Sequence, residues 1–184
     1  MSIVEQRGAS RNKRPARFTR SKTLKVMPEY LTYLDTDTLT EAGLDGYSFG
    51  YRDRVRFYEL DALNHVNNVV FLRWFETIRV SYFQDYGFSN YGPDDPTLVV
   101  RRATAEFLAP AFQNDEYIVA ARTRVIKPSS FLMEYAVASN RVLWSTGDAV
   151  VVSVDRDGKT RRVHRNEAIE TAVARDGAIR EGFA

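Results

Sequence analysis

The amino-acid sequence predicts an α+β domain in which one long helix is buried by a curved antiparallel sheet of five to six strands. Two patterns lead to this fold class. Residues 67–86 carry apolar side chains at helical spacing, and residues 98–154 contain four strand-like runs with hairpin-length connections. A strand, a long helix and then a series of antiparallel strands is typical of α+β proteins. The length of 184 residues favours one such domain, which we place at residues 46–184.

The first 25 residues differ from the rest of the chain in charge. They contain eight Lys or Arg side chains and one acidic residue, Glu5, so their net charge is +7, whereas the whole chain carries +2. The remainder therefore carries about −5, which gives the domain no general attraction to nucleic acid. We interpret residues 1–45 as a basic, disordered extension followed by a segment that wraps the domain. A solvated extension is the commonest role; the alternatives are a basic arm for nucleic acid or anionic membrane, and an Arg-rich transit peptide.

The composition excludes several kinds of site. The chain has no cysteine, so a disulfide framework, a thiolate nucleophile and a cysteine metal site are all ruled out. No apolar run reaches the roughly 18 residues that a membrane span needs. No basic segment leads into an apolar stretch, as it does in a secretory signal. We therefore expect a cytoplasmic protein with no membrane span.

The segment before the long helix is predicted to contain one helical turn and one strand. Residues 38–42 predict the turn, and residues 51–60 alternate between two faces, which predicts the first strand. One face of this strand is expected to meet water or an anionic ligand, because it carries Arg52, Arg54 and Arg56.

The long helix has clear signals at both ends. Asn67 is a good N-cap, because its side-chain oxygen can accept a free amide of the first turn, and Gly87 is placed to end the helix. Between them the apolar stripe is wide, so the helix is expected to be largely buried. The apolar residues are Val70, Phe71, Trp74, Phe75, Ile78, Tyr82, Phe83 and Tyr86.

Four further strands are predicted after the helix. The runs are separated by turn-forming residues and by prolines, which cannot continue a central strand. Their predicted ranges are 98–108, 115–127, 130–139 and 142–154.

The C-terminal part is predicted to hold a turn and a short helix. Asp157-Gly158 supplies the positive backbone angles of a tight turn, and a short strand over residues 160–163 is expected to return from it. Residues 166–174 predict a helix capped by Asn166. From Arg175 onward we expect the chain to fray.

Polar side chains crowd the connector between the first strand and the long helix. The first turn of a helix has free N–H groups and a partial positive charge, which can stabilise an oxyanion. A carboxylate such as Asp61 beside it can act as a general base or nucleophile, with His65 and Asn68 nearby. The structural alternative is that Asp61 caps a turn and His65 fills a polar crevice. We expect no metal or cofactor site, because His65 has no helical His partner and His164 belongs to another element.

Several of these residues form a recognisable motif: Glu59-Leu60-Asp61, His65-Val66-Asn67-Asn68, Phe75-Glu76 and Arg79. The motif resembles the signature of hotdog-fold acyl-thioester hydrolases, and its pattern is similar to the 4-hydroxybenzoyl-CoA thioesterase branch. Plant acyl-ACP thioesterases share the His-Val-Asn-Asn piece. The resemblance covers about residues 50–165.

The resemblance implies a hotdog fold, a homodimer or dimer of dimers, and active sites at the subunit interface. It implies that Asp61 is the catalytic carboxylate, that His65 and Asn68 lie beside the thioester carbonyl, and that helix N-terminal amides form the oxyanion hole. The expected substrate is an acyl-CoA of fatty acid metabolism, or an acyl carrier protein thioester. The acyl chain is expected to contact Phe71, Trp74 and Phe75.

Two features leave alternatives open. A third branch of the family uses a helix glutamate, which makes Glu76 a fallback catalytic residue; its alternative role is an ion pair with Arg73 or Arg79. One branch of the family has a glycine-rich turn followed by Val-Tyr-His after its Asp, and this chain does not, so residue roles beyond Asp61 are not transferred from that branch. Plant enzymes place a catalytic Asn where this chain has Leu63, and Asn64 is adjacent but offset. At the level of function, the alternative to an enzyme is a non-catalytic sensor that binds acyl thioesters on the same fold. A hydratase on this fold fits the motif less well.

Overall fold

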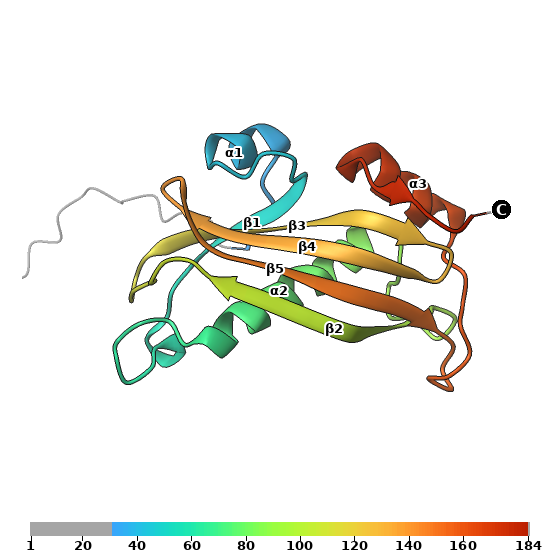
Figure 1. The fold of residues 1–184 in the computed structure, drawn as a ribbon, viewed down its shortest axis with the longest axis horizontal. Helices are drawn as coiled ribbons and strands as arrows, with labels where there is room; N and C mark the ends of the chain where they lie inside the picture. The colour runs from blue at the N-terminus through green and yellow to red at the C-terminus, as the bar shows by residue number, and fades with distance from the viewer. Residues whose placement is uncertain (1–30, 184) are drawn as a thin grey trace, which may run out of the picture.

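The computed structural model describes residues 31–183 and shows a curved sheet packed around one long helix (Figure 1). The predicted α+β fold class is thereby confirmed. The basic extension predicted over residues 1–25 lies outside the described residues. The helices are α1 (Thr36–Glu41), α2 (Asn68–Asp85) and α3 (Asn166–Asp176), with a 3-10 turn at Phe57–Glu59; the strands are β1 (Phe49–Arg54), β2 (Thr97–Phe107), β3 (Glu116–Lys127), β4 (Ser130–Ser139), β5 (Val142–Val154) and β6 (Ile179–Arg180).

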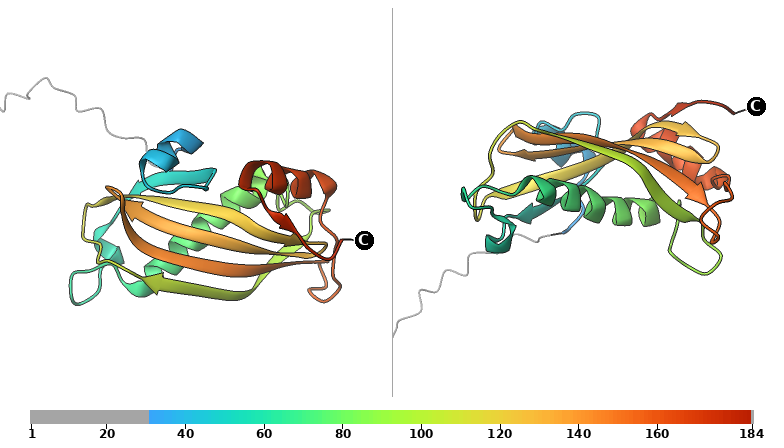
Figure 2. Two further views of the ribbon diagram at one scale, coloured as in Figure 1. Left: turned by 45° about the horizontal axis from the view of Figure 1, so that its top comes forward. Right: turned by 60° about the horizontal axis from the view of Figure 1, so that its bottom comes forward.

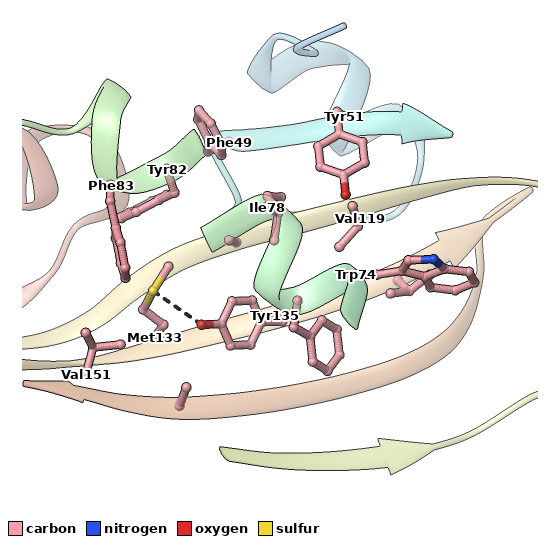
Figure 3. Packing of buried hydrophobic residues seen from close by; sticks show 14 of the residues in the cluster. Phe49, Tyr51, Trp74, Ile78, Tyr82, Phe83, Val119, Met133, Tyr135 and Val151 are labelled. Atoms are coloured by element: carbon pink, nitrogen blue, oxygen red, sulfur yellow. Dashed lines mark hydrogen bonds between the residues drawn. The ribbon is translucent and has the colours of Figure 1, made fainter. Parts of the chain in front are cut away.

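Helix α2 is the long helix that the sequence predicts, and it lies across one face of the sheet (Figure 2). The Asn67 side chain caps it by accepting the Val69 amide at 3.1 Å, and Gly87 follows its end with a φ of +75°. All eight apolar positions of the predicted stripe are buried. Figure 3 shows Ile78 and Tyr82 among them, packed beside sheet residues such as Tyr135.

The sheet has the order β1-β3-β4-β5-β2, and all of these neighbours pair in antiparallel fashion. The four strands predicted after the helix agree with the observed bounds to within about one residue. Strand β6 pairs with β3 in parallel, next to β1 on the same edge. The expectation that the chain frays from Arg175 is therefore wrong, because Gly177 ends α3 in the left-handed conformation and directs the chain back to β3.

The first predicted strand is shorter than expected. It was predicted to reach residue 60, but β1 ends at Arg54 and a 3-10 turn follows. The reason is that Asp53 accepts hydrogen bonds from the Arg54 amide and the Arg56 guanidinium, while the Arg56 amide donates to Glu59 at 2.7 Å. These local bonds replace a ladder with a neighbouring strand.

Two smaller predictions near the C-terminus are also corrected. The strand over residues 160–163 is reduced to one bridge between Val154 and Arg161, because the Asp157 side chain accepts the amides of Lys159 and Thr160 and holds the chain in a turn up to the start of the predicted strand. Helix α3 starts after Arg165, which makes no side-chain cap, so Asn166 is its first residue and not its cap.

The residues just before β1 pack on the other face of the sheet. Helix α1 begins two residues earlier than predicted, because Asp35 caps it by accepting the Thr38 amide at 2.8 Å. Leu39 is fully buried against aliphatic residues of β3 and β4. Within residues 31–183, no helix has both the length and the hydropathy that a bilayer span requires.

Candidate functional site

The connector between β1 and α2 is folded as a miniature hairpin. The Asn67 amide donates to the Glu59 carbonyl oxygen at 2.9 Å, and the Asp61 amide donates to the His65 carbonyl oxygen at 2.8 Å. Leu60 and Val66 form a bridge between these two hydrogen bonds. The backbone of residues 59–67 is therefore fixed, although the sequence suggests only a polar loop.

Asp61 lies in the turn of this hairpin and stabilises the turn with one of its two carboxylate oxygens. Oδ1 accepts the Leu63 amide at 2.8 Å and the His65 amide at 3.2 Å. Asn64 takes a left-handed φ of +60° to close the turn, which Asn tolerates better than most residues. Among the described residues, no hydrogen bond reaches Oδ2 of Asp61. The side chain thus caps a turn and still offers one carboxylate oxygen.

A cavity of about 380 Å³ opens beside this turn. It brings together four of the predicted site residues, namely Asp61, His65, Asn68 and Phe71. The opposite wall comes from the end of β2 and the segment after it, which is tied to the connector because the Val66 amide donates to the Ala111 carbonyl oxygen at 2.9 Å. The remaining lining residues are Leu63, Val66, Phe107, Leu108, Ala109, Pro110 and Ala111.

The polar residues around the cavity differ in how firmly they are held. His65 is half-buried, and its ring meets that of Phe112 edge-on, with centroids 5.1 Å apart. Asn68 is exposed on the first turn of α2. The amides of Val69 and Val70 donate to Asn67, whereas no acceptor for the Asn68 amide is found among the described residues. The Asn68 amide is therefore the helix-start donor that remains for an oxyanion.

Two predicted substrate contacts belong to the core and do not line the cavity. Trp74 stacks on Tyr117 with ring centroids 4.1 Å apart, and Phe75 stacks on Tyr135 at 4.8 Å. Both helix residues are no more than 4% exposed. Phe71 stands between Trp74 and the cavity, so it is the one residue of the predicted three that lines the wall.

Glu76 lies on the exposed side of α2 and not at the cavity. In the described part of the chain it forms no ion pair with Arg73 or Arg79, the partners that the sequence suggests. The Arg79 guanidinium instead donates to the Tyr135 hydroxyl at 3.1 Å. The structure therefore separates Glu76 from the group formed by Asp61, His65 and Asn68.

A buried ionic network behind the connector was missed by the sequence analysis. The Arg56 guanidinium forms a bidentate ion pair with Asp53, which is 4% exposed, and these hydrogen bonds raise the pKa of Arg56. The Tyr117 hydroxyl donates to the same carboxylate at 3.4 Å, and burial and the negative charge of Asp53 raise the pKa of Tyr117. The alternation of residues 51–60 did place Asp53 and Glu59 on the face of Tyr51, so it contained the signal for their burial.

The cavity wall formed by residues 107–111 was also missed as a site. The sequence marks it only as the apolar end of a strand followed by Pro110. Its place beside the connector depends on sheet pairing, which spacing along the chain does not reveal. In the part of the chain that the structure describes, no group of three or more His, Asp or Glu side chains is arranged to hold a metal ion.

Comparison with protein families gives a match over most of the domain. The model of the thioesterase-like superfamily matches residues 55–175. A putative esterase from Aquifex aeolicus is 32% identical over 91 residues, which cover 48% of this chain and 71% of that protein. An uncharacterised Bacillus subtilis protein, YsmA, is 28% identical over 89 residues, and the match spans 60% of its length.

Solved structures show the same similarity in three dimensions. A thioesterase superfamily protein from Jannaschia sp. CCS1 superimposes with a TM-score of 0.79 at 33% identity, covering 84% of this chain and all of that one. A thioesterase from Thermus thermophilus, solved in complex with coenzyme A and zinc, has a TM-score of 0.61 at 33% identity and covers 72% of this chain and 97% of its own.

Proposed function

The chain belongs to the thioesterase-like superfamily, and from this premise we propose that it hydrolyses acyl-CoA thioesters to the free acid and CoA. The observation that carries the proposal is the free Oδ2 of Asp61 at the wall of an open cavity, next to the start of α2. The coenzyme A bound to the similar Thermus thioesterase supports a CoA thioester as the substrate class. An acyl carrier protein thioester is the alternative.

In this mechanism Oδ2 of Asp61 takes a proton from a water molecule, which attacks the thioester carbonyl carbon. The negative charge that develops on the carbonyl oxygen is stabilised by the Asn68 amide and by the partial positive charge of the helix start. Collapse of the tetrahedral intermediate breaks the carbon–sulfur bond and releases the CoA thiolate, which takes up the proton from Asp61. The alternative route is direct attack by Asp61 to give an anhydride, which water then hydrolyses.

The proposal includes a homodimer or a dimer of dimers. Within residues 31–183, no strand pairs with the outer side of β2, and every residue on this strand is exposed or half-buried. Val99, Val100 and Phe107 on this strand are 38%, 41% and 43% exposed. An exposed edge with apolar side chains is suited to pairing with a second copy. Phe107 also lines the cavity, so such a copy would border the site.

Steady-state hydrolysis of a panel of acyl-CoAs tests the proposal. The panel contains aliphatic acyl groups of increasing length and aromatic acyl groups, with the matching acyl carrier protein thioesters in parallel. We expect Asp61→Asn to lower kcat at least about 100-fold, because it removes the general base. Asn retains an oxygen that can accept the Leu63 and His65 amides, so the turn is expected to persist. Near-full activity in the variant would show that Asp61 is not the catalytic carboxylate.

The same experiment separates the enzyme from the alternative function. If the wild-type protein binds acyl-CoA but turns over no member of the panel, the sensor interpretation replaces the enzyme. The cytoplasmic location and the role in fatty acid metabolism stay predictions.

A further inference from the structure

A buried glutamate lies two residues before Asp61, and the proposed mechanism does not use it. Glu59 is 6% exposed, and both of its carboxylate oxygens are engaged. Oε2 accepts the Arg56 amide at 2.7 Å, and Oε1 accepts the Trp74 indole Nε1–H at 3.0 Å. One side chain therefore connects the 3-10 turn before the connector to the second turn of α2.

The backbone of the same residue closes the hairpin that carries Asp61. The Glu59 carbonyl oxygen accepts the Asn67 amide, which is the last one before α2 begins. Only Leu60 separates Glu59 from Asp61, and Leu60 itself bridges to Val66. A shift of Glu59 is therefore passed through fixed backbone to Asp61 at one end and to the helix start at the other.

The donor on α2, the indole N–H of Trp74, is itself fixed by packing. Trp74 is 4% exposed and stacks on Tyr117, with the planes inclined by 23°. The Trp74 ring also contacts Phe71, which lines the cavity, with ring centroids 5.0 Å apart. The indole N–H thus has a fixed direction, and a carboxylate bonded to it acquires a fixed position.

We propose that Glu59 is a positioning residue of the active site: through Trp74 it sets the distance between the Asp61 turn and the oxyanion-stabilising start of α2. The inference rests on the proposed thioesterase function. Hydrolysis requires the water held by Asp61 and the carbonyl oxygen held at the helix start to share one substrate carbon. A misplacement of about 1 Å between such groups can cost about 100-fold in rate.

The main variant is Glu59→Gln, which preserves the shape of the side chain. The Arg56 amide and the Trp74 indole bond to different oxygens of the carboxylate, and Gln replaces one of these oxygens with an NH₂ group, so one of the two donors loses its acceptor. We expect kcat to fall about tenfold or more while KM stays within about twofold, because substrate contacts are untouched. Trp74→Phe removes the donor of the same bond. If the two residues act as one unit, the kcat of the double variant is no lower than that of the less active single variant.

Asp53→Asn is the matched control. Asp53 is as deeply buried as Glu59 and accepts hydrogen bonds from the Arg56 guanidinium and the Tyr117 hydroxyl. Within residues 31–183 it makes no hydrogen bond with the hairpin or with α2. We expect this variant to lower the melting temperature at least as much as Glu59→Gln and to leave kcat within about twofold. Equal losses of kcat in the two variants, or wild-type kcat in a folded Glu59→Gln protein, would overturn the positioning role.

Amide hydrogen exchange gives a readout that does not depend on activity. The peptide over residues 59–67 contains the Asp61 and Asn67 amides that close the hairpin. We expect it to exchange about tenfold faster in Glu59→Gln than in Asp53→Asn, and equal exchange would refute the inference. If the wild-type protein hydrolyses no thioester, the proposed function fails, whereas this comparison still decides whether Glu59 holds the hairpin.

Discussion

Asp61 and His65 are bonded to each other twice across a five-residue turn. The Asp61 amide donates to the His65 carbonyl oxygen at 2.8 Å, and Oδ1 of Asp61 accepts the His65 amide at 3.2 Å. The proposed base and the motif histidine therefore cannot move independently at the backbone level. This arrangement places the unpaired carboxylate oxygen of Asp61 in a fixed position beside the cavity.

The turn depends on Asn64, which has a φ of +60°. A left-handed conformation costs an alanine roughly 1–2 kcal/mol, whereas glycine adopts it without steric strain. We expect Asn64→Ala to lower the free energy of unfolding by about 1 kcal/mol and to lower kcat as well, while Asn64→Gly has a smaller effect on both. Urea denaturation and steady-state kinetics measure these changes. An Ala variant as stable as the wild type would contradict the strain argument.

Glu76 and Asp61 are rival carboxylates, and the geometry favours Asp61. Glu76 is exposed and lies away from the cavity, whereas Asp61 lines it. We expect Glu76→Gln to keep kcat within about threefold of the wild type, in contrast to a loss of at least about 100-fold for Asp61→Asn. The assay is hydrolysis of the acyl-CoA that the wild type prefers. A loss in Glu76→Gln as large as that in Asp61→Asn would assign the chemistry to the helix glutamate.

The elements that spacing predicts well are those with one dominant period. The apolar stripe of α2 is wide, and its two ends have side-chain or glycine signals at Asn67 and Gly87, so its length was predicted correctly. The strands after residue 97 are bounded by turn residues and prolines, and they too were predicted closely. Propensity fails where side chains compete for backbone groups, as Asp53 and Glu59 do after β1.

Only the part of the candidate site whose residues are close together in the sequence could be predicted. Asp61, His65 and Asn68 are close in sequence and lie at one cavity. The opposite wall, from Phe107 to Ala111, is brought there by sheet topology, which no local pattern contains. Trp74 was assigned to substrate because it is apolar and near the motif, but its N–H is committed to the buried Glu59 carboxylate.

The exposed β2 edge predicts an assembly that charge can block. We expect Val99→Lys combined with Val100→Lys to shift the protein from dimer to monomer in analytical ultracentrifugation, because lysines on an edge strand oppose pairing between copies. Activity should fall in parallel if a second copy borders the cavity. A matched control is Val163→Lys, since Val163 is 65% exposed and lies outside the sheet. A wild-type protein that sediments as a monomer would contradict the proposed assembly.

His164 predicts a pH dependence of stability. Burial lowers its pKa to about 4, from an ordinary value of 6.5, although a hydrogen bond to the Ser130 backbone opposes the shift. Between these two values the unfolded chain binds a proton that the folded chain does not. The contribution of neutral His164 to the free energy of unfolding is therefore fully present above pH 6.5. It is lost as the pH drops toward 4, by at most about 3 kcal/mol. We expect His164→Phe to show a shallower decline of the unfolding free energy over this range than the wild type. Parallel curves for the two proteins would refute the assignment.

Asp176 at the end of α3 predicts a large stability effect from one uncharged substitution. Its carboxylate accepts the Tyr82 hydroxyl at 2.5 Å and the Tyr86 hydroxyl at 2.7 Å, and it thereby joins α3 to α2. Asp176→Asn removes the charge from these bonds, and hydrogen bonds to a charged group contribute about 1.5–3 kcal/mol each. We expect a loss of about 2–3 kcal/mol in urea denaturation. The control is Asp85→Asn, which breaks an exposed ion pair with Arg175 and should cost less than about 1 kcal/mol. Equal losses in the two variants would mean that the tyrosine contacts do not hold α3 in place.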